Sequence, residues 1–456
     1  MSRRPRLVVL GDCLLDRDLS GHVERVCPDA PAPVVDLEDA ASRPGGAGLT
    51  ALLAAAEGAD VTLVAPLGSD AEGRELRTLL EAGGVRVVGL GHDGPTRVKT
   101  RVRAAGQSIV RIDSGGPGRL LGGLTGEAER ALETADAVLV SCYGAGVTQD
   151  PDVRAALTRR ARRRVVVWDP HPRGADPVEG CAIVTPNLAE ARERAGVPDA
   201  PGDVLAARLR EQWRARAVAV TGGERGAWVA TSAGEPLFAP ATEAAGDPCG
   251  AGDRFASAAA VALARGRTTS EAVIEAVARA SEFVAAGGAA ALAASPGSAA
   301  AGVPTPTRRR HPDRPTGTGV LVATGGCFDV LHAGHVTLLE AARGLGDSLV
   351  VLLNSDGSVR RLKGPGRPVN SAADRARTLL GLSCVDDVVV FDEDDPRSAL
   401  DRLRPDIWTK GGDYEDAELP EADLVRSWGG RVVLLPYLSG RSSTAVLHAI
   451  HRGDHS

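Results

Sequence analysis

Short runs of apolar, mostly β-branched residues alternate with alanine-rich stretches of helical spacing along almost the whole chain. Segments such as Leu49–Ala56 and Asp203–Trp213 have the helical period, with apolar positions three and four residues apart. Strands that alternate with helices favour a mostly parallel sheet covered by helices, an α/β fold. In the first part of the chain the pattern predicts strands over Leu7–Leu10, Val61–Ala65, Val138–Ser141, Val165–Trp168, Ile183–Thr185 and Val218–Thr221.

Two further β-type runs, Val98–Arg103 and Ser108–Ile112, flank an Ala-Ala-Gly turn. They predict an antiparallel hairpin, which a parallel sheet does not need. We therefore expect a small β flap that lies over a site.

The pattern changes after the helical pair Gly252–Arg265 and Ser270–Ala286, where a stretch rich in Pro, Ala and Arg follows. Such composition predicts an interdomain linker, and Arg308–Arg310 within it is interpreted as a solvated cluster. We expect one domain over residues 1–295, a linker over 296–318 and a second domain over 319–456. In the second domain the alternation restarts with strands Val320–Ala323, Leu349–Leu353, Val388–Phe391, Ile407–Thr409 and Val432–Leu435, and a helix His335–Arg343.

Composition narrows the class of protein. The 456 residues are 43% hydrophobic and 25% charged, which is typical of globular chains, and no apolar run is long enough to span a membrane. A net charge of −6 argues against a nucleic-acid partner, and seven scattered cysteines favour reduced thiols in the cytoplasm. Only Lys99, Lys363 and Lys410 among the 53 basic residues are lysine, so each is a candidate for a specific role.

A glycine-rich octapeptide, Gly-Asp-Pro-Cys-Gly-Ala-Gly-Asp, precedes the long helix in the first domain. Gly250, Ala251 and Gly252 can direct backbone N–H groups to one point at the helix start and form an anion hole. Asp253 would lie in the first turn, where it can accept a proton from a hydroxyl group. Taken alone, the segment also fits a glycine-rich turn with an aspartate cap.

Three other segments of the first domain have chemistry that suits a nucleotide or a polyol. Asn187, Leu188, Ala189 and Glu190 open a helix after a strand, and the Asn–Glu spacing suits magnesium-bound water or a plain capping box. Thr221 and Gly223 end a strand in a turn that can approach a nucleotide. Carboxylates and glycines at strand ends suit sugar hydroxyls: these are Asp12, Asp16, Gly45 and Gly46.

Together these motifs resemble the ribokinase-like, or PfkB, carbohydrate kinases over most of residues 1–295. The resemblance implies a three-layer α/β domain, ATP as phosphoryl donor, Asp253 as base and magnesium near Asn187 and Glu190. It implies no metal site built from protein ligands alone. Leu49 stands where the family usually has asparagine, and Cys249 where it usually has threonine.

The second domain has the segment Gly-Gly-Cys-Phe-Asp-Val-Leu-His-Ala-Gly-His from Gly325. Its strand ends in glycines, and His332 and His335 lie where a helix starts, so both imidazoles can converge on one phosphate. A metal pair is disfavoured because no third ligand accompanies the histidines. Lys363 and Lys410, in glycine-rich loops, are placed to neutralise a triphosphate. Further candidates for nucleotide binding are Gly326, Cys327, Phe328, Asn354, Asp356, Arg367, Ser442, Ser443 and Thr444.

This half resembles the cytidylyltransferase-like nucleotidyltransferases, which implies a Rossmann-like domain. The Arg-Leu-Lys-Gly and Lys-Gly-Gly-Asp-Tyr segments are most similar to heptose-phosphate adenylyltransferases. A sugar kinase followed by this transferase resembles one family, the bifunctional heptose 7-phosphate kinases and heptose 1-phosphate adenylyltransferases. That resemblance implies ATP at both sites, Arg101 and Arg111 as candidates for the terminal phosphate of the sugar, and a homodimer formed through the kinase domain.

Three other interpretations stay open at this point. The same chemistry could act on another sugar, with CTP in the second site. A degenerate kinase half could serve as a scaffold for an active transferase, an idea prompted by Leu49. A dinucleotide-dependent oxidoreductase is disfavoured because no Gly-x-Gly-x-x-Gly follows the first strand.

Overall fold

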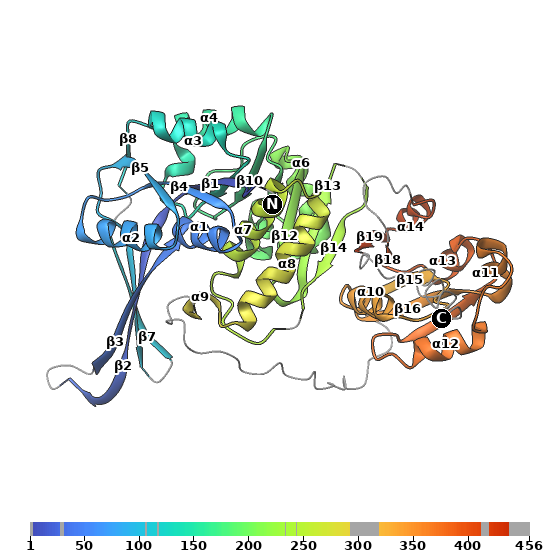
Figure 1. Ribbon diagram of the computed structural model, residues 1–456. Helices are drawn as coiled ribbons and strands as arrows, with labels where there is room; N and C mark the ends of the chain where they lie inside the picture. The colour runs from blue at the N-terminus through green and yellow to red at the C-terminus, as the bar shows by residue number, and fades with distance from the viewer. Residues whose placement is uncertain are drawn as a thin grey trace, which may run out of the picture. The chain divides into compact units, whose positions relative to one another are not determined.

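A computed structural model describes residues 3–27, 32–104, 107–115, 118–232, 234–242, 244–291, 319–411 and 419–436. The chain divides into two compact units, the first comprising residues 1–230 with 241–298 and the second 231–240 with 299–456. Each unit is an α/β structure, as the alternation of strands and helices predicts (Figure 1).

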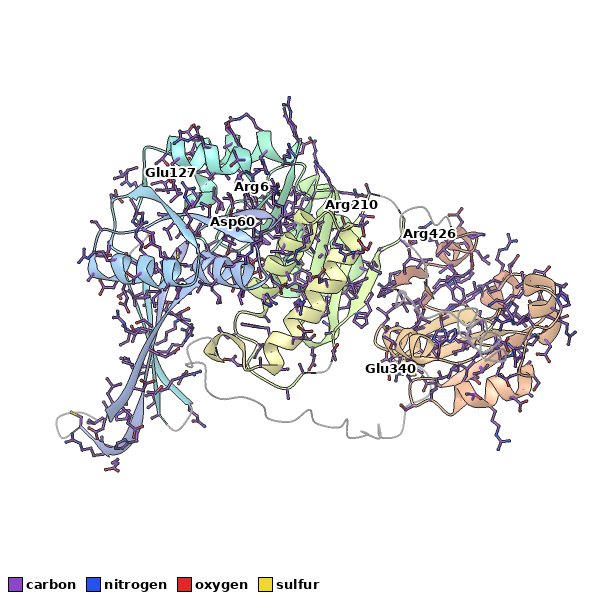
Figure 2. All side chains as sticks on the ribbon, viewed as in Figure 1. Arg6, Asp60, Glu127, Arg210, Glu340 and Arg426 are labelled. Atoms are coloured by element: carbon purple, nitrogen blue, oxygen red, sulfur yellow. The ribbon has the colours of Figure 1, made fainter. Side chains whose placement is uncertain are left out.

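The first unit is built on a parallel sheet in which β1 (Arg6–Gly11) lies between β4 (Asp60–Pro66) and β9 (Ala137–Ser141). Figure 2 labels Arg6 and Asp60, the paired residues at the start of β1 and β4. The predicted strands are confirmed to within two residues at each end. The sheet continues with β10 (Val165–Asp169), β11 (Ile183–Val184) and β12 (Ala217–Thr221) on one side, and with β5 (Arg86–His92) and the short antiparallel β8 (Leu120–Leu121) on the other.

Alternate side chains of β1 and β9 point to opposite faces of the sheet, and each face is covered by helices. Val8, Leu10, Val138 and Val140 pack in one core cluster with buried residues of the helices on that face. Those helices are α3 (Gly126–Thr134), α4 (Pro151–Ala161), α5 (Leu188–Ala195) and α6 (Gly202–Trp213). On the other face α1 (Ala47–Ala56) and α7 (Ala251–Ala264) contact the central strands, and α8 (Thr269–Ala285) packs on α7. The predicted three-layer domain is confirmed.

The first unit has a few further elements. α2 (Ala71–Ala82) contacts β5 and the base of the flap. The others are the 3₁₀ turns η1 (Val147–Gln149) and η2 (Gly223–Arg225), the strand β13 (Gly226–Thr231) and the short helix α9 (Gly288–Ala291).

A separate four-stranded sheet forms the flap, in the order β3-β2-β6-β7. β6 (Val98–Ala104) and β7 (Gln107–Ser114) pair antiparallel, as the hairpin prediction expects. The other two strands, β2 (Cys13–Val26) and β3 (Pro33–Gly46), are long and were not predicted. Figure 1 shows β2, β3 and β7 extending away from the helices of this unit. Because β2 starts one residue after Asp12, the end of β1 continues directly into the flap.

The second unit has a parallel sheet in the order β17-β16-β15-β18-β19. Its strands are β15 (Leu321–Gly326), β16 (Ser348–Asn354), β17 (Asp387–Phe391), β18 (Ile407–Gly411) and β19 (Arg431–Leu435). The order reverses beside β15, and ligands bind at the carboxyl ends of strands at such a point. The helices are α10 (Ala333–Arg343), α11 (Asp356–Lys363), α12 (Ala372–Leu380), α13 (Arg397–Leu403) and α14 (Ala422–Ser427). β14 (Leu237–Pro240) lies in the segment that groups with this unit.

No helix in the described ranges is both long enough and apolar enough to cross a lipid bilayer.

Candidate active sites

In the first unit Asp253 occupies the first turn of α7 and is buried, with 6% of its surface exposed. The helix begins after Gly250, whose φ of 83° is in the left-handed region that glycine tolerates. The Oγ1 of Thr50 donates to Asp253 Oδ1 at 2.7 Å, and the hydroxyl of Tyr143 lies 2.8 Å from both carboxylate oxygens. The carboxylate is therefore fixed in direction at the start of the helix.

The pKa of Asp253 is raised to about 6 because the carboxyl group is buried. The hydrogen bonds from Thr50 and Tyr143 oppose this rise, since they stabilise the charged form. The group is thus ionised at neutral pH yet basic enough to accept a proton from a hydroxyl group.

The glycine turn before α7 leaves backbone N–H groups at the helix start. The N–H of Ala251 donates to the carbonyl of Pro248 at 3.0 Å, so it is engaged within the turn. Nothing lies within 4 Å of a Cβ placed on Gly252, and this space is open to a ligand. The N–H groups of Gly252 and Asp253, at the first turn, are the ones that can meet an anion there.

Leu49, one of the two departures from the family pattern, lies against this turn. A Cβ on Gly250 would be 3.1 Å from Leu49 Cδ2. Leu49 also shares an apolar cluster with Leu53, Phe283 and Ala289. Leu49 therefore supports the glycine turn from α1, while its neighbour Thr50 makes the polar contact to Asp253.

Asp12 and Gly46, two of the residues expected to face the sugar, lie beside Tyr143. The carboxylate of Asp12 accepts from the N–H groups of Tyr143 at 3.0 Å and Ala145 at 2.9 Å, so it also holds the loop after β9. Gly46 leaves room for the ring of Tyr143, which would be 3.4 Å from its Cβ. Asp12 and Tyr143 share the wall of a small cavity with Arg97.

Asp16 and Gly45 meet at the root of the flap, where a Cβ on Gly45 would clash with Asp16 Oδ2 at 2.4 Å. Arg101 on β6 donates to Asp16 Oδ1 at 2.6 Å. Arg111 lies opposite Arg101 across the hairpin, but it is exposed and pairs with Asp113 at 2.9 Å. The structure thus gathers Asp16, Gly45 and Arg101, and leaves Arg111 on the outer strand.

The capping box that the sequence allowed at Asn187 is present at the start of α5. Asn187 Oδ1 accepts from the N–H of Glu190, and Glu190 Oε2 accepts from the N–H of Asn187, both at 3.0 Å. Leu188 and Ala189 form the first turn between them. Asn187 also bridges to Thr221 at the end of β12, and a Cβ on Gly223 in the following turn would meet no atom within 4 Å.

Asp169, at the carboxyl end of β10, was not among the predicted site residues. Its pKa is raised well above the usual value by burial and by the nearby charges of Asp253 and Glu190, while a 2.8 Å hydrogen bond from Thr185 opposes the rise. These carboxylates form a region of excess negative charge in which a cation would be stabilised.

Sequence reasoning also missed Tyr143, because a lone tyrosine in a loop gives no pattern. Its own pKa is raised well above 10, first by burial and then by the charge of Asp253. His171 stacks on its ring with centroids 6.1 Å apart, and Lys99 Nζ lies 5.8 Å from the ring centroid. The rarity of lysine in the chain was a signal that pointed to Lys99.

Replacing Tyr143 with Phe is expected to move the acid limb of the kinase pH profile upward from about 6. The Tyr143 hydroxyl lowers the pKa of Asp253, so its loss raises that pKa and more of the base is protonated at a given acidic pH. The logarithm of kcat/KM plotted against pH from 5 to 8 measures the shift. A variant with reduced rate but an unmoved acid limb would contradict this role for Tyr143.

In the second unit His332 caps α10 and His335 lies in its first turn, with ring centroids 3.9 Å apart. Phe328, which has a φ of 43°, places its ring 5.3 Å from that of His335. The pKa of His335 is lowered to about 4 by burial and by the charges of His332 and Lys363. A bound phosphate would oppose that shift, because an anion favours the protonated imidazole.

Buried polar contacts fix the loops around the two histidines. Asp329 accepts from Arg367 Nη1 at 2.6 Å and from the N–H of Val369 at 2.7 Å. Arg375, 2% exposed, donates to the carbonyl of Cys327 and to Asp356 at 2.8 Å. Sequence reasoning missed Arg375, which joins the Gly326–Phe328 loop to the start of α11.

The remaining candidates of this unit are only partly gathered. Asn354 ends β16 and is 3.8 Å from the Sγ of Cys327. Lys363 ends α11 and is close enough to His335 to lower its pKa. Lys410 is the last residue but one of β18 and pairs with the buried Glu421 at 2.7 Å. The predicted phosphate-binding residues Ser442, Ser443 and Thr444 lie outside the described residues.

The two folds and their sites define a class: a carbohydrate kinase joined to a nucleotidyltransferase in one chain. Residues 4–295 match the model of the pfkB family carbohydrate kinases, and residues 323–435 match the cytidylyltransferase-like family. Two solved kinases share the first fold, each with a TM-score of 0.50, 21% identity and 62% of this chain covered. They are ribokinase from Arabidopsis thaliana, of whose chain 93% is covered by the match, and phosphofructokinase-2 from Escherichia coli, of whose chain 95% is covered.

The chain is similar over nearly its full length to curated proteins named "Bifunctional protein HldE". One from Streptomyces coelicolor is 52% identical over 97% of this chain and 96% of its own length. Another, from Azotobacter vinelandii, is 37% identical over 98% of both chains. The chain belongs to the pfkB family of carbohydrate kinases and, with its second unit, to the bifunctional HldE proteins.

Proposed function

We propose that the chain catalyses two steps of ADP-heptose synthesis. The first unit transfers the γ-phosphoryl group of ATP to the anomeric oxygen of heptose 7-phosphate, which gives heptose 1,7-bisphosphate. A separate phosphatase removes the 7-phosphate, and the second unit joins AMP from ATP to heptose 1-phosphate with release of pyrophosphate. The observation that carries the proposal is that each unit has candidate phosphate-binding residues at the start of a helix, in a chain that is similar to an HldE protein over 97% of its length.

In the first reaction Asp253 accepts the proton of the anomeric hydroxyl as that oxygen attacks the γ-phosphorus. The bond from the γ-phosphorus to the β–γ bridging oxygen breaks, and ADP leaves. The N–H groups at the start of α7 stabilise the charge on the transferred group. The intact contacts of Asp253 support an active kinase, since Leu49 leaves them undisturbed.

Magnesium fits the first site as a companion of ATP. Among the described residues no group of three or more His, Cys, Asp or Glu side chains could hold a metal by itself. Mg²⁺ normally keeps several waters and binds substrate phosphates together with one or two carboxylates. Asp169 and Glu190 would hold its waters, and the ion would neutralise charge on the triphosphate.

In the second reaction the heptose 1-phosphate oxygen attacks the α-phosphorus of ATP and pyrophosphate leaves. His332 and His335, beside the N–H groups of α10, donate to the oxygens on which charge develops. Lys363 and Lys410 would neutralise the leaving pyrophosphate. Sequence motifs also admit CTP, so the choice of nucleotide is part of the test.

The flap supports a homodimer through the kinase unit. Its edge strands β3 and β7 have exposed apolar side chains, among them Leu37, Val110 and Ile112, at 57%, 46% and 51% exposure. Burial of such a surface against a second copy would remove it from water. Light scattering on the purified protein is expected to give twice the chain mass of 46.9 kDa, and a monomer at all concentrations would refute the proposal.

The substrate assignment is tested with purified protein, ATP, magnesium and a panel of sugar phosphates. Heptose 7-phosphate is expected to give the bisphosphate, seen by ³¹P NMR, with a kcat/KM above those of ribose 5-phosphate and fructose 6-phosphate. In parallel, heptose 1-phosphate with ATP should release pyrophosphate faster than with CTP. Turnover of another sugar phosphate in preference to heptose 7-phosphate would overturn the assignment.

A further inference from the structure

Helix α1 supplies contacts to both Asp253 and the glycine turn before it. Thr50 donates to Asp253 Oδ1, and Leu49 lies against the turn at Gly250. α1 and α7 pack against each other. The direction of the Asp253 carboxylate therefore depends on how α1 is placed against the first turn of α7.

Arg254, the residue after Asp253, extends from this first turn to the C-terminal end of α1. Its guanidinium forms an ion pair with Glu57 Oε1, and its Nη1 lies 3.5 Å from the carbonyl oxygen of Leu53. The ion pair is nearly buried, with 12% of the Arg254 side chain and 9% of the Glu57 side chain exposed. Thr50 and Glu57 are about two helical turns apart, so both lie on the side of α1 that meets α7.

Glu57 is an unexpected residue at this position. It is the C-cap of α1, and the free carbonyl groups at that end of a helix disfavour a carboxylate. Two more arginines compensate for this. Arg279 Nε on α8 lies 3.4 Å from Glu57 Oε1, and Arg265 at the end of α7 donates to the Glu57 carbonyl at 2.6 Å. Glu57 thus joins α1 to both α7 and α8.

The ion pair and the carboxylate of Asp253 belong to consecutive residues of one helical turn. Asp253 meets Thr50 near the start of α1, while Arg254 meets Glu57 at its end. Two contacts at separate points of α1 fix the rotation of the α7 turn against it. A buried ion pair adds little net stability over apolar residues of the same volume, but its geometry is demanding. This pair is therefore better suited to setting the placement of the two helices than to stabilising them.

We infer that Glu57 and Arg254 are positioning residues of the kinase unit, whose ion pair holds α1 against the first turn of α7 and so keeps the Thr50 hydroxyl on Asp253. The inference rests on the proposed kinase reaction, in which Asp253 is the base. Loss of the ion pair loosens the contact with Thr50 and leaves the base less well directed. It also raises the pKa of Asp253, because the hydrogen bond from Thr50 stabilises the charged carboxylate.

Other groups act on the Asp253 carboxylate from the loop after β9, from the flap and from the end of β10. They are Tyr143, Asp16, Lys99 and Asp169. Because these groups belong to elements other than α1 and α7, a change of Glu57 leaves them in place. A shift in the pKa of Asp253 then reports on its contact with Thr50.

The test measures the kinase activity of Glu57→Gln from pH 5 to 8 with heptose 7-phosphate and ATP. At pH 7 kcat is expected to fall by about tenfold, with KM for both substrates within about twofold of wild type. The acid limb of kcat/KM should move upward from about 6 by about one pH unit, the effect of one lost hydrogen bond to a charged group. Arg254→Met should give the same changes. Arg254→Lys keeps the charge and should stay within about threefold of the wild-type kcat.

The Thr50→Val variant separates a positioning role from a general loss of stability. It should shift the acid limb by the same amount, and adding Glu57→Gln to it should cause no further shift, because both changes remove one contact. Additive shifts, or an acid limb that stays near 6 in Glu57→Gln, would overturn the inference. If circular dichroism shows that Glu57→Gln does not fold, Glu57→Asp replaces it under the same criteria, since it withdraws the carboxylate by one methylene group.

The matched control is Arg267→Gln, which removes an exposed ion pair with Glu271 of α8 and should change neither kcat nor the acid limb. If the wild-type protein does not phosphorylate heptose 7-phosphate, the proposed function fails by itself. The inference is then decided without substrate, by ¹³C NMR titration of the Asp253 carboxyl group, whose signal is identified by its absence in Asp253→Asn. The pKa should be about one unit higher in Glu57→Gln than in wild type, and equal values would overturn the inference.

Discussion

The Asp253→Asn variant is expected to lose kinase turnover by about a thousandfold, while its adenylyl transfer stays within about twofold of wild type. Asparagine keeps the shape of the side chain and can still meet Thr50 and Tyr143. It cannot accept the proton of the attacking hydroxyl, so the nucleophile is not activated. The selectivity of the loss follows because the two reactions use different helix starts in different units.

Release of ADP from ATP and heptose 7-phosphate measures the first activity, and release of pyrophosphate from ATP and heptose 1-phosphate measures the second. Asp60→Asn, an exposed carboxylate at the start of β4, is the matched control and should leave both unchanged. Kinase turnover near wild type in Asp253→Asn would remove the base from the mechanism. A parallel loss of pyrophosphate release would indicate instead that the change disturbs the whole chain.

Changing His335 to Asn is expected to have the opposite selectivity, with adenylyl transfer reduced by about a hundredfold to a thousandfold and the kinase spared. The imidazole lies at the start of α10 beside His332, where donors can stabilise charge on the α-phosphate. The pKa of about 4 means that the His335 ring is neutral in the free enzyme at pH 7. Its stabilisation of the developing charge is therefore greatest once a bound nucleotide phosphate favours the protonated ring. His332→Asn should cause a loss of the same order.

Pyrophosphate release at saturating ATP gives the size of both losses, and circular dichroism checks that the variants fold. Glu340→Gln, an exposed change further along α10, is the control and should retain full activity in both reactions. Either histidine variant with more than half of wild-type adenylyl transfer would contradict the proposed role of the pair.

Much of the fold could be predicted because its strands are short, apolar and buried. β1 and β9 have Leu, Val and Ala at nearly every position, as strands covered on both faces require. The long flap strands β2 and β3 gave no such signal, since their outer parts are half-exposed and charged on both faces. The hairpin β6–β7 was found because Val and Ile recur in it.

Site residues were predicted where a short sequence motif indicates the chemistry. They were missed where only the folded structure brings a side chain to the site. The glycine turn before Asp253 and the His pair at α10 are both explicit in the sequence. Tyr143 and Asp169 come from loops and strand ends that only the folded sheet brings to Asp253. Arg375 was missed because a buried arginine within a helix has no distinguishing pattern.

The most direct measurement of the central claim mixes two variants that each lack one activity, Asp253→Asn and His335→Asn, in one reaction. With heptose 7-phosphate, ATP, magnesium and a phosphatase that removes the 7-phosphate, the mixture should form ADP-heptose at a rate comparable to that of wild type. Each variant alone should form almost none. If the mixture is as inactive as the separate variants, then the chain does not house two independent centres of phosphate transfer.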